Sequence, residues 1–182
     1  MNGNRRFLEG FNICLTSLSK EDLQRAQSII AHNGGTHSPA IIDITGCIVT
    51  GSVNDKNYQA AQKSKKIACV TVRWLFDSSK ETKVEPGKRR KLPLPLEDYP
   101  VPPFLGLTIT CTQVGPEDRK EIEHIVTANK GKYSGELIRG TCTHLVCLRG
   151  DMVGSDKYRS ARQWGIFTVS DKWVKDCRDQ KS

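Results

Sequence analysis

The amino-acid sequence predicts an α/β fold made of two copies of one domain, each with a parallel sheet that carries helices on both faces. Two observations lead to this prediction. The chain repeats itself, because Gly10 with Gly106 and Thr16 with Thr112 are both 96 positions apart (106 − 10; 112 − 16). In each copy, short apolar segments also alternate with amphipathic ones, which is typical of parallel strands joined by helices. The same offset relates Glu21 to Glu117, Asp22 to Asp118, Ile29 to Ile125, Asn33 to Asn129 and Gly35 to Gly131.

The first half of each copy predicts a strand followed by a helix. Residues 11–15 form a short apolar strand in copy one. The helix that follows has an acidic first turn, Glu21-Asp22 or Glu117-Asp118, which suits the positive end of the helix dipole. Glycine at positions 35 and 131 ends the helix. Its apolar face consists of Leu23, Ala26, Ile29 and Ile30 in copy one and of Ile122, Ile125 and Val126 in copy two.

Two more strands and two more helices complete each copy. Apolar runs predict buried strands over residues 44–49 and 67–70, and over 143–148 and 166–169. A short helix around residues 58–61 or 158–161 lies between these strands. A helix that contains Trp74 or Trp173 closes each copy, over residues 72–78 and 171–177.

A proline-rich segment separates the two copies. Six of the eight prolines in the chain lie between Pro86 and Pro103. Proline resists both helix and sheet, so we expect a semi-extended connector. We predict a first domain over residues 5–79, a proline-rich basic linker over 80–102 and a second domain over 103–180. The run Lys88-Arg89-Arg90-Lys91 is either a nuclear import signal or a solvated stretch of linker.

The composition excludes several classes of protein. No apolar stretch approaches the roughly 20 residues of a membrane-spanning helix, and no apolar region follows the basic N-terminus as in a secretion signal. Seven cysteines, an odd number without a Cys-x-x-Cys pair, favour a reducing compartment over a disulfide framework. The formal net charge of +8 favours anionic partners such as nucleic acid, acidic lipid or phosphorylated protein.

Several short motifs are shared by the two copies or occur in copy two alone. They are Gly10 and Gly106, Asn33-Gly34-Gly35 and Lys130-Gly131-Lys132, Thr143-His144-Leu145-Val146, Lys157-Tyr158-Arg159-Ser160-Ala161, and Trp74 and Trp173. Together they resemble the BRCT domain family. The Phe-x-Gly-Leu-x-Ile-x-x-Thr opening at residues 104–112 is most similar to the topoisomerase II-binding branch of replication-checkpoint scaffolds and its yeast relatives. Copy one departs from the family in its third strand, where Thr45-Gly46-Cys47-Ile48-Val49 replaces Thr-His-Leu-Val. The resemblance implies a four-stranded parallel sheet flanked by three helices in each repeat.

The same resemblance implies a phosphate site in each repeat. Family members that bind phosphopeptides use a Ser or Thr hydroxyl at the end of the first strand, the next backbone N–H and a Lys at the start of the second helix. These positions correspond to Thr112, Gln113 and Lys157 in copy two. Arg119, one turn into the helix that follows Thr112, is a further candidate phosphate ligand. In copy one the positions correspond to Thr16, Ser17 and Lys56.

Two alignments compete for the lysine of copy one. Matching Tyr58 with Tyr158 places Asn57 opposite Lys157, whereas matching Ala60 with Ala161 places Lys56 there. We prefer Lys56, because an alanine packed on the sheet would determine which face of the helix is buried, whereas a tyrosine can be exposed.

We therefore predict a non-catalytic module that binds phosphorylated Ser/Thr motifs of DNA-replication or DNA-damage proteins in the nucleus. The alternative is a module that binds DNA ends or a 5′ phosphate through the same pocket. The sequence contains no nucleophile arrangement, nucleotide loop or His and Cys spacing typical of zinc. We expect no cofactor, no metal, no membrane partner and a monomeric chain.

Overall fold

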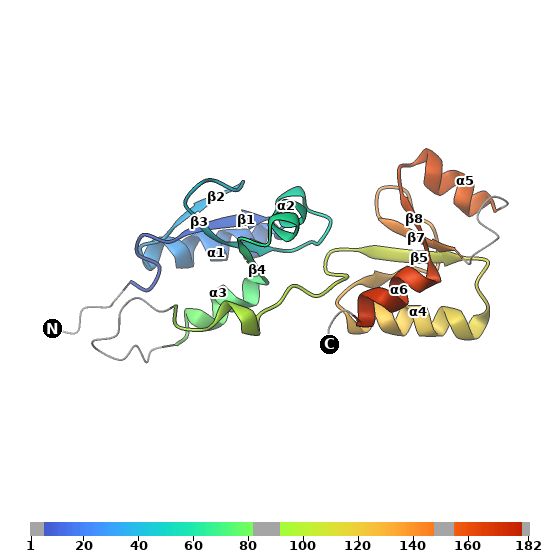
Figure 1. Ribbon diagram of the computed structural model, residues 1–182. Coiled ribbons are helices and arrows are strands. Elements are labelled where there is room, and N and C mark those ends of the chain that lie inside the picture. The colour runs from blue at the N-terminus through green and yellow to red at the C-terminus, as the bar shows by residue number, and fades with distance from the viewer. Residues whose placement is uncertain (1–5, 82–91, 148–154, 180–182) are drawn as a thin grey trace. The chain divides into compact units, whose positions relative to one another are not determined.

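The computed structural model describes residues 6–81, 92–147 and 155–179, which form two compact units, repeat one up to Val101 and repeat two from Pro102 (Figure 1). The predicted basic run at residues 88–91 lies outside the described residues. Within the described ranges, no helix is long and apolar enough to cross a membrane. All seven cysteines are free thiols.

Repeat one contains a four-stranded parallel sheet in the order β2-β1-β3-β4. The α/β prediction is confirmed, and the three strands located from the sequence lie close to their expected positions. The elements are β1 (Asn12–Thr16), α1 (Lys20–His32), β2 (Thr36–Ser38), β3 (Thr45–Thr50), α2 (Lys56–Ser64), β4 (Ala68–Val70), α3 (Val72–Ser78) and the short 3-10 helix η1 (Leu96–Asp98).

Repeat two has the same topology, with the parallel order β6-β5-β7-β8. Helix α5 lies on one face of this sheet, and α4 and α6 lie together on the other (Figure 1). The elements are β5 (Thr108–Thr112), α4 (Pro116–Ala128), β6 (Lys132–Tyr133), β7 (His144–Cys147), α5 (Asp156–Gln163), β8 (Phe167–Ser170) and α6 (Asp171–Asp179).

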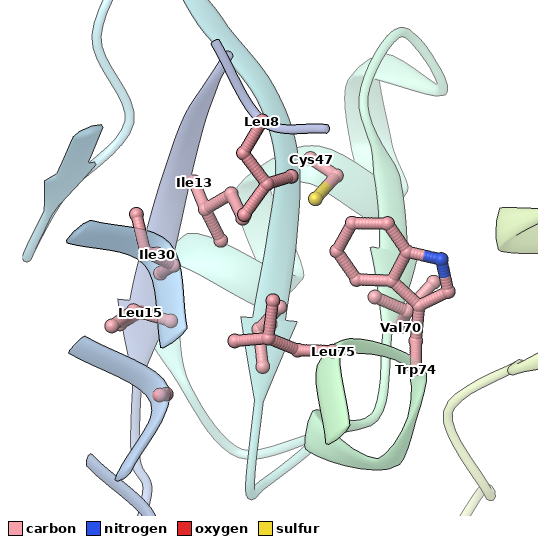
Figure 2. Close-up of a cluster of buried hydrophobic side chains, with 10 residues drawn as sticks. Leu8, Ile13, Leu15, Ile30, Cys47, Val70, Trp74 and Leu75 are labelled. Atoms are coloured by element: carbon pink, nitrogen blue, oxygen red, sulfur yellow. The ribbon is translucent and has the colours of Figure 1, made fainter. Parts of the chain in front are cut away.

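The core of repeat one fills both faces of its sheet because side chains alternate along each strand. Ile13 and Leu15 point into the larger cluster, which also contains Leu75 and the fully buried Trp74 (Figure 2). Cys14, between them in sequence, packs on the opposite face with Ile48 and Ala61 of α2. A sheet that is apolar on both faces requires helices on both sides, as the sequence predicts.

Glycine after the first helix allows close packing in both repeats. A Cβ at Gly35 would lie 2.8 Å from the Cβ of Leu8, and a Cβ at Gly131 would lie 2.8 Å from the Cβ of Phe104. These contacts explain why glycine occupies both positions of the duplicated sequence. The preceding residue has a positive φ in each repeat, 76° at Gly34 and 65° at Lys130.

Residues 92–101, which we call the strap, pack against repeat one. The indole Nε1–H of Trp74 donates to the carbonyl oxygen of Leu94 at 3.0 Å, and the N–H of Thr71 donates to that of Tyr99 at 3.2 Å. Val70 of the edge strand forms an antiparallel bridge with Pro100. The compact unit therefore extends beyond the predicted boundary at residue 79, because the leucines that alternate with prolines here reach the core of repeat one.

Candidate functional site

The candidate site of each repeat lies where the first strand ends, opposite the N-terminus of the second helix. Strand β1 ends at Thr16 and β5 ends at Thr112. The next residue is left-handed in both repeats, with φ of 53° at Ser17 and 54° at Gln113. Such backbone is rare for residues other than glycine and clusters at functional sites. The sequence contains no glycine there that could have indicated it.

In repeat two, Thr112 contacts Ser155 at the start of α5, the turn that also carries Lys157. Ser155 is the N-cap of α5, and its hydroxyl accepts a hydrogen bond from the N–H of Tyr158 at 3.1 Å. The hydroxyl of Thr112 donates to the same oxygen at 3.4 Å. The ammonium of Lys157, at the second position of the helix, donates to the carbonyl oxygen of Gly135 at 3.2 Å. Two hydroxyls and a cation thus lie at the positive end of a helix dipole, an arrangement that favours an anion.

Arg119 lies in the first turn of α4, where its backbone N–H donates to the carbonyl oxygen of Gly115 at 2.9 Å. Thr112 and Cys111 are adjacent in β5, so their side chains point to opposite faces of the sheet. The thiol of Cys111 lies 3.0 Å from the hydroxyl of Tyr133, and the charge of Arg119 acts on the same tyrosine. Burial raises the pKa of Tyr133, the hydrogen bond to Cys111 adds to this effect, and Arg119 opposes it. The charge of Arg119 thus acts on Tyr133, and its role as a phosphate ligand stays a prediction.

In repeat one, the equivalent position is occupied by a carboxylate. Asp55 is the N-cap of α2, and its Oδ2 accepts from the hydroxyls of Thr16 at 2.6 Å and Ser17 at 2.9 Å. Its Oδ1 accepts from the backbone N–H groups of Asn57 at 2.8 Å and Tyr58 at 3.2 Å. One side chain thus accepts four hydrogen bonds from the end of β1 and the start of α2.

These contacts make Asp55 more acidic. Burial alone would raise its pKa, but the hydrogen bonds from Thr16 and Ser17 and from the N–H groups of Tyr58 and Asn57 outweigh burial. The net effect is a pKa below the ordinary value of 3.8. Asp55 is therefore a carboxylate at neutral pH.

The alignment that we preferred for the lysine of copy one is wrong. Ala61, not Ala60, is the buried alanine of α2, as Ala161 is in α5, so Asn57 is the equivalent of Lys157. Side-chain contacts agree with this alignment.

The Nδ2 of Asn57 donates to the carbonyl oxygen of Pro39 at 3.3 Å and to Thr16 Oγ1 at 3.4 Å. Pro39 and Gly135 are equivalent, because each lies three residues after the first paired residue of its strand, Thr36 or Lys132. Lys56 is exposed at the first position of α2. The expectation failed because alanines occupy both positions 60 and 61, and only packing distinguishes them.

Asp55, Ser155 and Gly51 were missed in the sequence. Asp and Ser are common N-caps, so a search for cap residues in the three positions before each predicted helix could have found the first two. The N–H of Gly51 donates to the carbonyl oxygen of Thr16 at 3.1 Å, and a Cβ there would lie 2.1 Å from the carbonyl oxygen of Ser17. Glycine is required because the two backbone segments approach so closely, which no local pattern indicates.

Among the described residues, no cluster of three or more His, Cys, Asp or Glu side chains could hold a metal ion. His144 is used in packing instead. Its ring stacks on Trp173 with centroids 5.0 Å apart and an angle of 6° between the planes.

Comparison with known proteins supports the BRCT resemblance over both repeats. The model of the BRCA1 C-terminal (BRCT) domain matches residues 3–79, and that of the twin BRCT domain matches residues 107–173. PAX-interacting protein 1 of Danio rerio is 30% identical over 158 residues, which make up 86% of this chain and 16% of that protein. The S-M checkpoint control protein rad4 of Schizosaccharomyces pombe is 24% identical over 176 residues, which are 94% of this chain and 26% of that protein. This chain thus spans a minor part of the length of both relatives.

Solved structures share the fold of the whole chain. The crystal structure of Rad4 BRCT1,2 with a Crb2 phosphopeptide is 20% identical, has a TM-score of 0.67 and aligns over 97% of this chain and 94% of that chain. The structure of Rad4 BRCT1,2 with an Mdb1 phosphopeptide is 21% identical, with a TM-score of 0.69 and the same coverage. The duplicated topology and the two family matches lead to one conclusion: the chain is a tandem pair of BRCT domains and belongs to the BRCT family.

Proposed function

We propose that repeat two binds a phosphorylated Ser or Thr side chain of a partner protein. This proposal rests on one observation. Thr112 contacts Ser155 at the N-terminus of α5, which also carries Lys157, and the left-handed residue Gln113 follows Thr112. The hydroxyl of Thr112 and the backbone N–H of Gln113 act as directional donors. The ammonium of Lys157 supplies the countercharge.

The chemistry of a phosphate monoester fits this cluster. Such a group carries about −1.5 to −2 charges near neutral pH and has three acceptor oxygens. The bond from Thr112 to Ser155 is long, at 3.4 Å, so a phosphate oxygen can replace Ser155 as the acceptor at little cost. The bond from Lys157 to Gly135 joins an ammonium to a neutral carbonyl, and a phosphate is the stronger partner.

We further propose that the chain is a non-catalytic scaffold module of a nuclear protein in DNA replication or damage signalling. The support is the likeness to a checkpoint control protein and to Rad4 BRCT1,2, which was crystallised with phosphopeptides. The partner proteins would be phosphorylated replication or repair proteins. The net charge of +8 favours DNA ends as the alternative ligand.

A charge reversal tests the site. Lys157→Glu should remove binding of a phosphothreonine peptide library while leaving repeat two folded, because this side chain acts at the surface. Lys172→Glu on α6 is the matched control, since it makes the same change in charge at an exposed position on the opposite face of the sheet. If the folded Lys157→Glu variant bound the phosphothreonine library with unchanged affinity, the phosphate site proposed for repeat two would be wrong.

The phosphate itself is the second part of the test. Charge-assisted hydrogen bonds contribute about 1.5–3 kcal/mol each, partly offset by desolvation of the lysine and the phosphate. The phosphorylated library should therefore bind at least about tenfold better than the unphosphorylated one, a difference of roughly 1.4 kcal/mol. Equal affinity for both, with strong binding of a 5′-phosphorylated duplex, would favour the DNA reading.

A further inference from the structure

The two repeats present the same backbone at the candidate site but different side chains at the N-cap and second position of the helix. Each has a threonine at the end of the first strand, a left-handed residue after it and the N-terminus of the second helix facing it. Repeat two places serine at the N-cap and lysine at the second helical position. Repeat one places Asp55 and Asn57 there. The first helical position, between these two, also differs, with Lys56 in repeat one and Asp156 in repeat two. The N-cap and the second helical position are the two whose side chains form the hydrogen bonds of the site.

The carboxylate of Asp55 already uses the donors that repeat one could offer to a phosphate. It accepts from both hydroxyls at the end of β1 and from two N–H groups at the start of α2. Two carboxylate oxygens have about four lone-pair sites, so the acceptor capacity of Asp55 is filled. An incoming phosphate would have to displace all four bonds and would meet a like charge.

Repeat one also lacks the cation. Asn57, the equivalent of Lys157, contributes a neutral amide that contacts Thr16 Oγ1 and the carbonyl oxygen of Pro39. Lys56 is next to it in sequence but is exposed and precedes the position from which Lys157 reaches Gly135. The site of repeat one is thus complete without a ligand.

We propose that Asp55 is an internal anion that closes the phosphate pocket of repeat one, so that one phosphate binds per chain, at repeat two. The inference rests on the function proposed for repeat two and determines which repeat selects the phosphorylated residue. Asp55 and Asn57 are the specificity-determining residues. Asp55 supplies the negative charge that a phosphate would bring, and Asn57 stands where repeat two has the cation Lys157.

Transferring the two residues of repeat two into repeat one tests this proposal. Asp55→Ser keeps a good N-cap, as Ser155 shows, and Asn57→Lys adds the cation. Both changes are made together in the Lys157→Glu chain, in which repeat two is silenced. The controls are each single change in the same background. Asn57→Lys alone should gain little, because the introduced ammonium would pair with Asp55.

The readouts are NMR shifts of assigned backbone amides with terminally blocked phosphothreonine as the probe, and affinity for the phosphothreonine library. In the wild-type chain, the amides of Gln113 and Lys157 should shift with saturation, whereas those of Ser17 and Asn57 should not. In the double variant, Ser17 should respond, and the library should bind at least tenfold more tightly than it does to Asn57→Lys alone.

Two results would overturn the proposal. One is a wild-type chain in which Ser17 and Asn57 titrate with the same midpoint as Gln113. The other is a folded double variant with no preference for the phosphorylated library. A different pattern separates the proposed function from this inference: if the wild-type amides of Gln113 and Lys157 stay silent while the double variant binds, repeat two lacks the proposed function but Asp55 has the role proposed here.

Discussion

At the scale of single residues, the site depends on the left-handed backbone at Ser17 and Gln113. A residue other than glycine in this conformation costs roughly 1 kcal/mol or more and persists only where its surroundings impose it. Here the N–H of Gly51 donates to the carbonyl oxygen of Thr16, which holds the strand end of repeat one in place. The same conformation recurs in repeat two, so the duplication preserved the backbone while the charges diverged.

Thr112 supplies one donor of the proposed phosphate site. Thr112→Val removes its hydroxyl with little change in volume and should weaken phosphopeptide binding by roughly tenfold, since Lys157 and the N–H of Gln113 remain. Thr112→Ser is the control and should keep most of the affinity. Titration calorimetry with a phosphothreonine peptide measures both. Full retention of binding in Thr112→Val would show that this hydroxyl does not contact the phosphate.

His144 makes the stability of repeat two depend on pH. Its ring is buried against Trp173 and lies 5.2 Å from Phe167, and burial lowers its pKa from 6.5 to about 4. Between these two values the unfolded chain binds a proton that the folded chain does not bind. The contribution of the neutral His144 ring to the unfolding free energy is therefore fully present above about pH 6.5. It falls as the pH drops toward 4, by up to about 3 kcal/mol.

Urea unfolding at pH 7, 5.5 and 4.5, followed by the indole signal of Trp173, tests this dependence. His144→Phe should flatten the profile between pH 6.5 and 4.5, and His124→Gln, an exposed change, should not. Asp55 acts in a different range. Its lowered pKa provides stability above 3.8, and this is lost only as the pH falls through its still lower folded value. If the unfolding free energy depended on pH between 6.5 and 4.5 equally in wild type and His144→Phe, His144 would not be the group responsible.

At the scale of elements, the strap is the largest departure from the predicted boundaries. Its alternating prolines disfavour α-helix and sheet, and the side chains of Leu92, Leu94 and Leu96 pack against the core of repeat one. Trp74 is fully buried with a bonded indole N–H, whereas Trp173, at the equivalent position of repeat two, remains partly exposed.

Weakening the strap should therefore destabilise repeat one. Leu94→Ala and Leu96→Ala should each lower its unfolding free energy by about 1–2 kcal/mol. This is less than Leu→Ala costs at a fully buried position, because both side chains are only partly buried. Hydrogen exchange of the Trp74 indole N–H should accelerate in both variants. Glu97→Ala, in the exposed part of η1, serves as the control and should leave this exchange unchanged. Equal protection in all three variants would mean that the strap does not stabilise the repeat.

At the scale of the whole molecule, the net charge of +8 attracts any polyanion, so affinity alone does not identify the ligand. Salt dependence does. A pocket for one phosphate should give a slope of log affinity against log salt of about −1 to −2. Binding along a DNA backbone through about six phosphates would give about −5. Titrations of a phosphothreonine peptide between 50 and 200 mM salt measure the slope, and a value near −5 would favour nucleic acid.

The sequence by itself determined the duplication, the α/β class and the main strands and helices, whereas the threonine and lysine proposed for repeat two came from the BRCT resemblance. The duplication and the elements depend on the spacing of apolar residues and on matches between the copies, both of which can be read from the sequence. Strands β2 and β6 were not located, because segments such as Thr36–Ser38 are short and polar and are defined only by pairing with β1.

Only the tertiary structure decided the site of repeat one. Two adjacent alanines made the alignment of α2 ambiguous until packing showed that Ala61 is the buried one, which places Asn57 opposite Lys157. Asp55 is 39 positions from Thr16 (55 − 16), and its bonds to Thr16 and Ser17 exist only because the parallel sheet brings the end of β1 to the start of α2. Hydrogen bonding between residues so far apart in sequence depends on their approach in space, which local patterns do not encode.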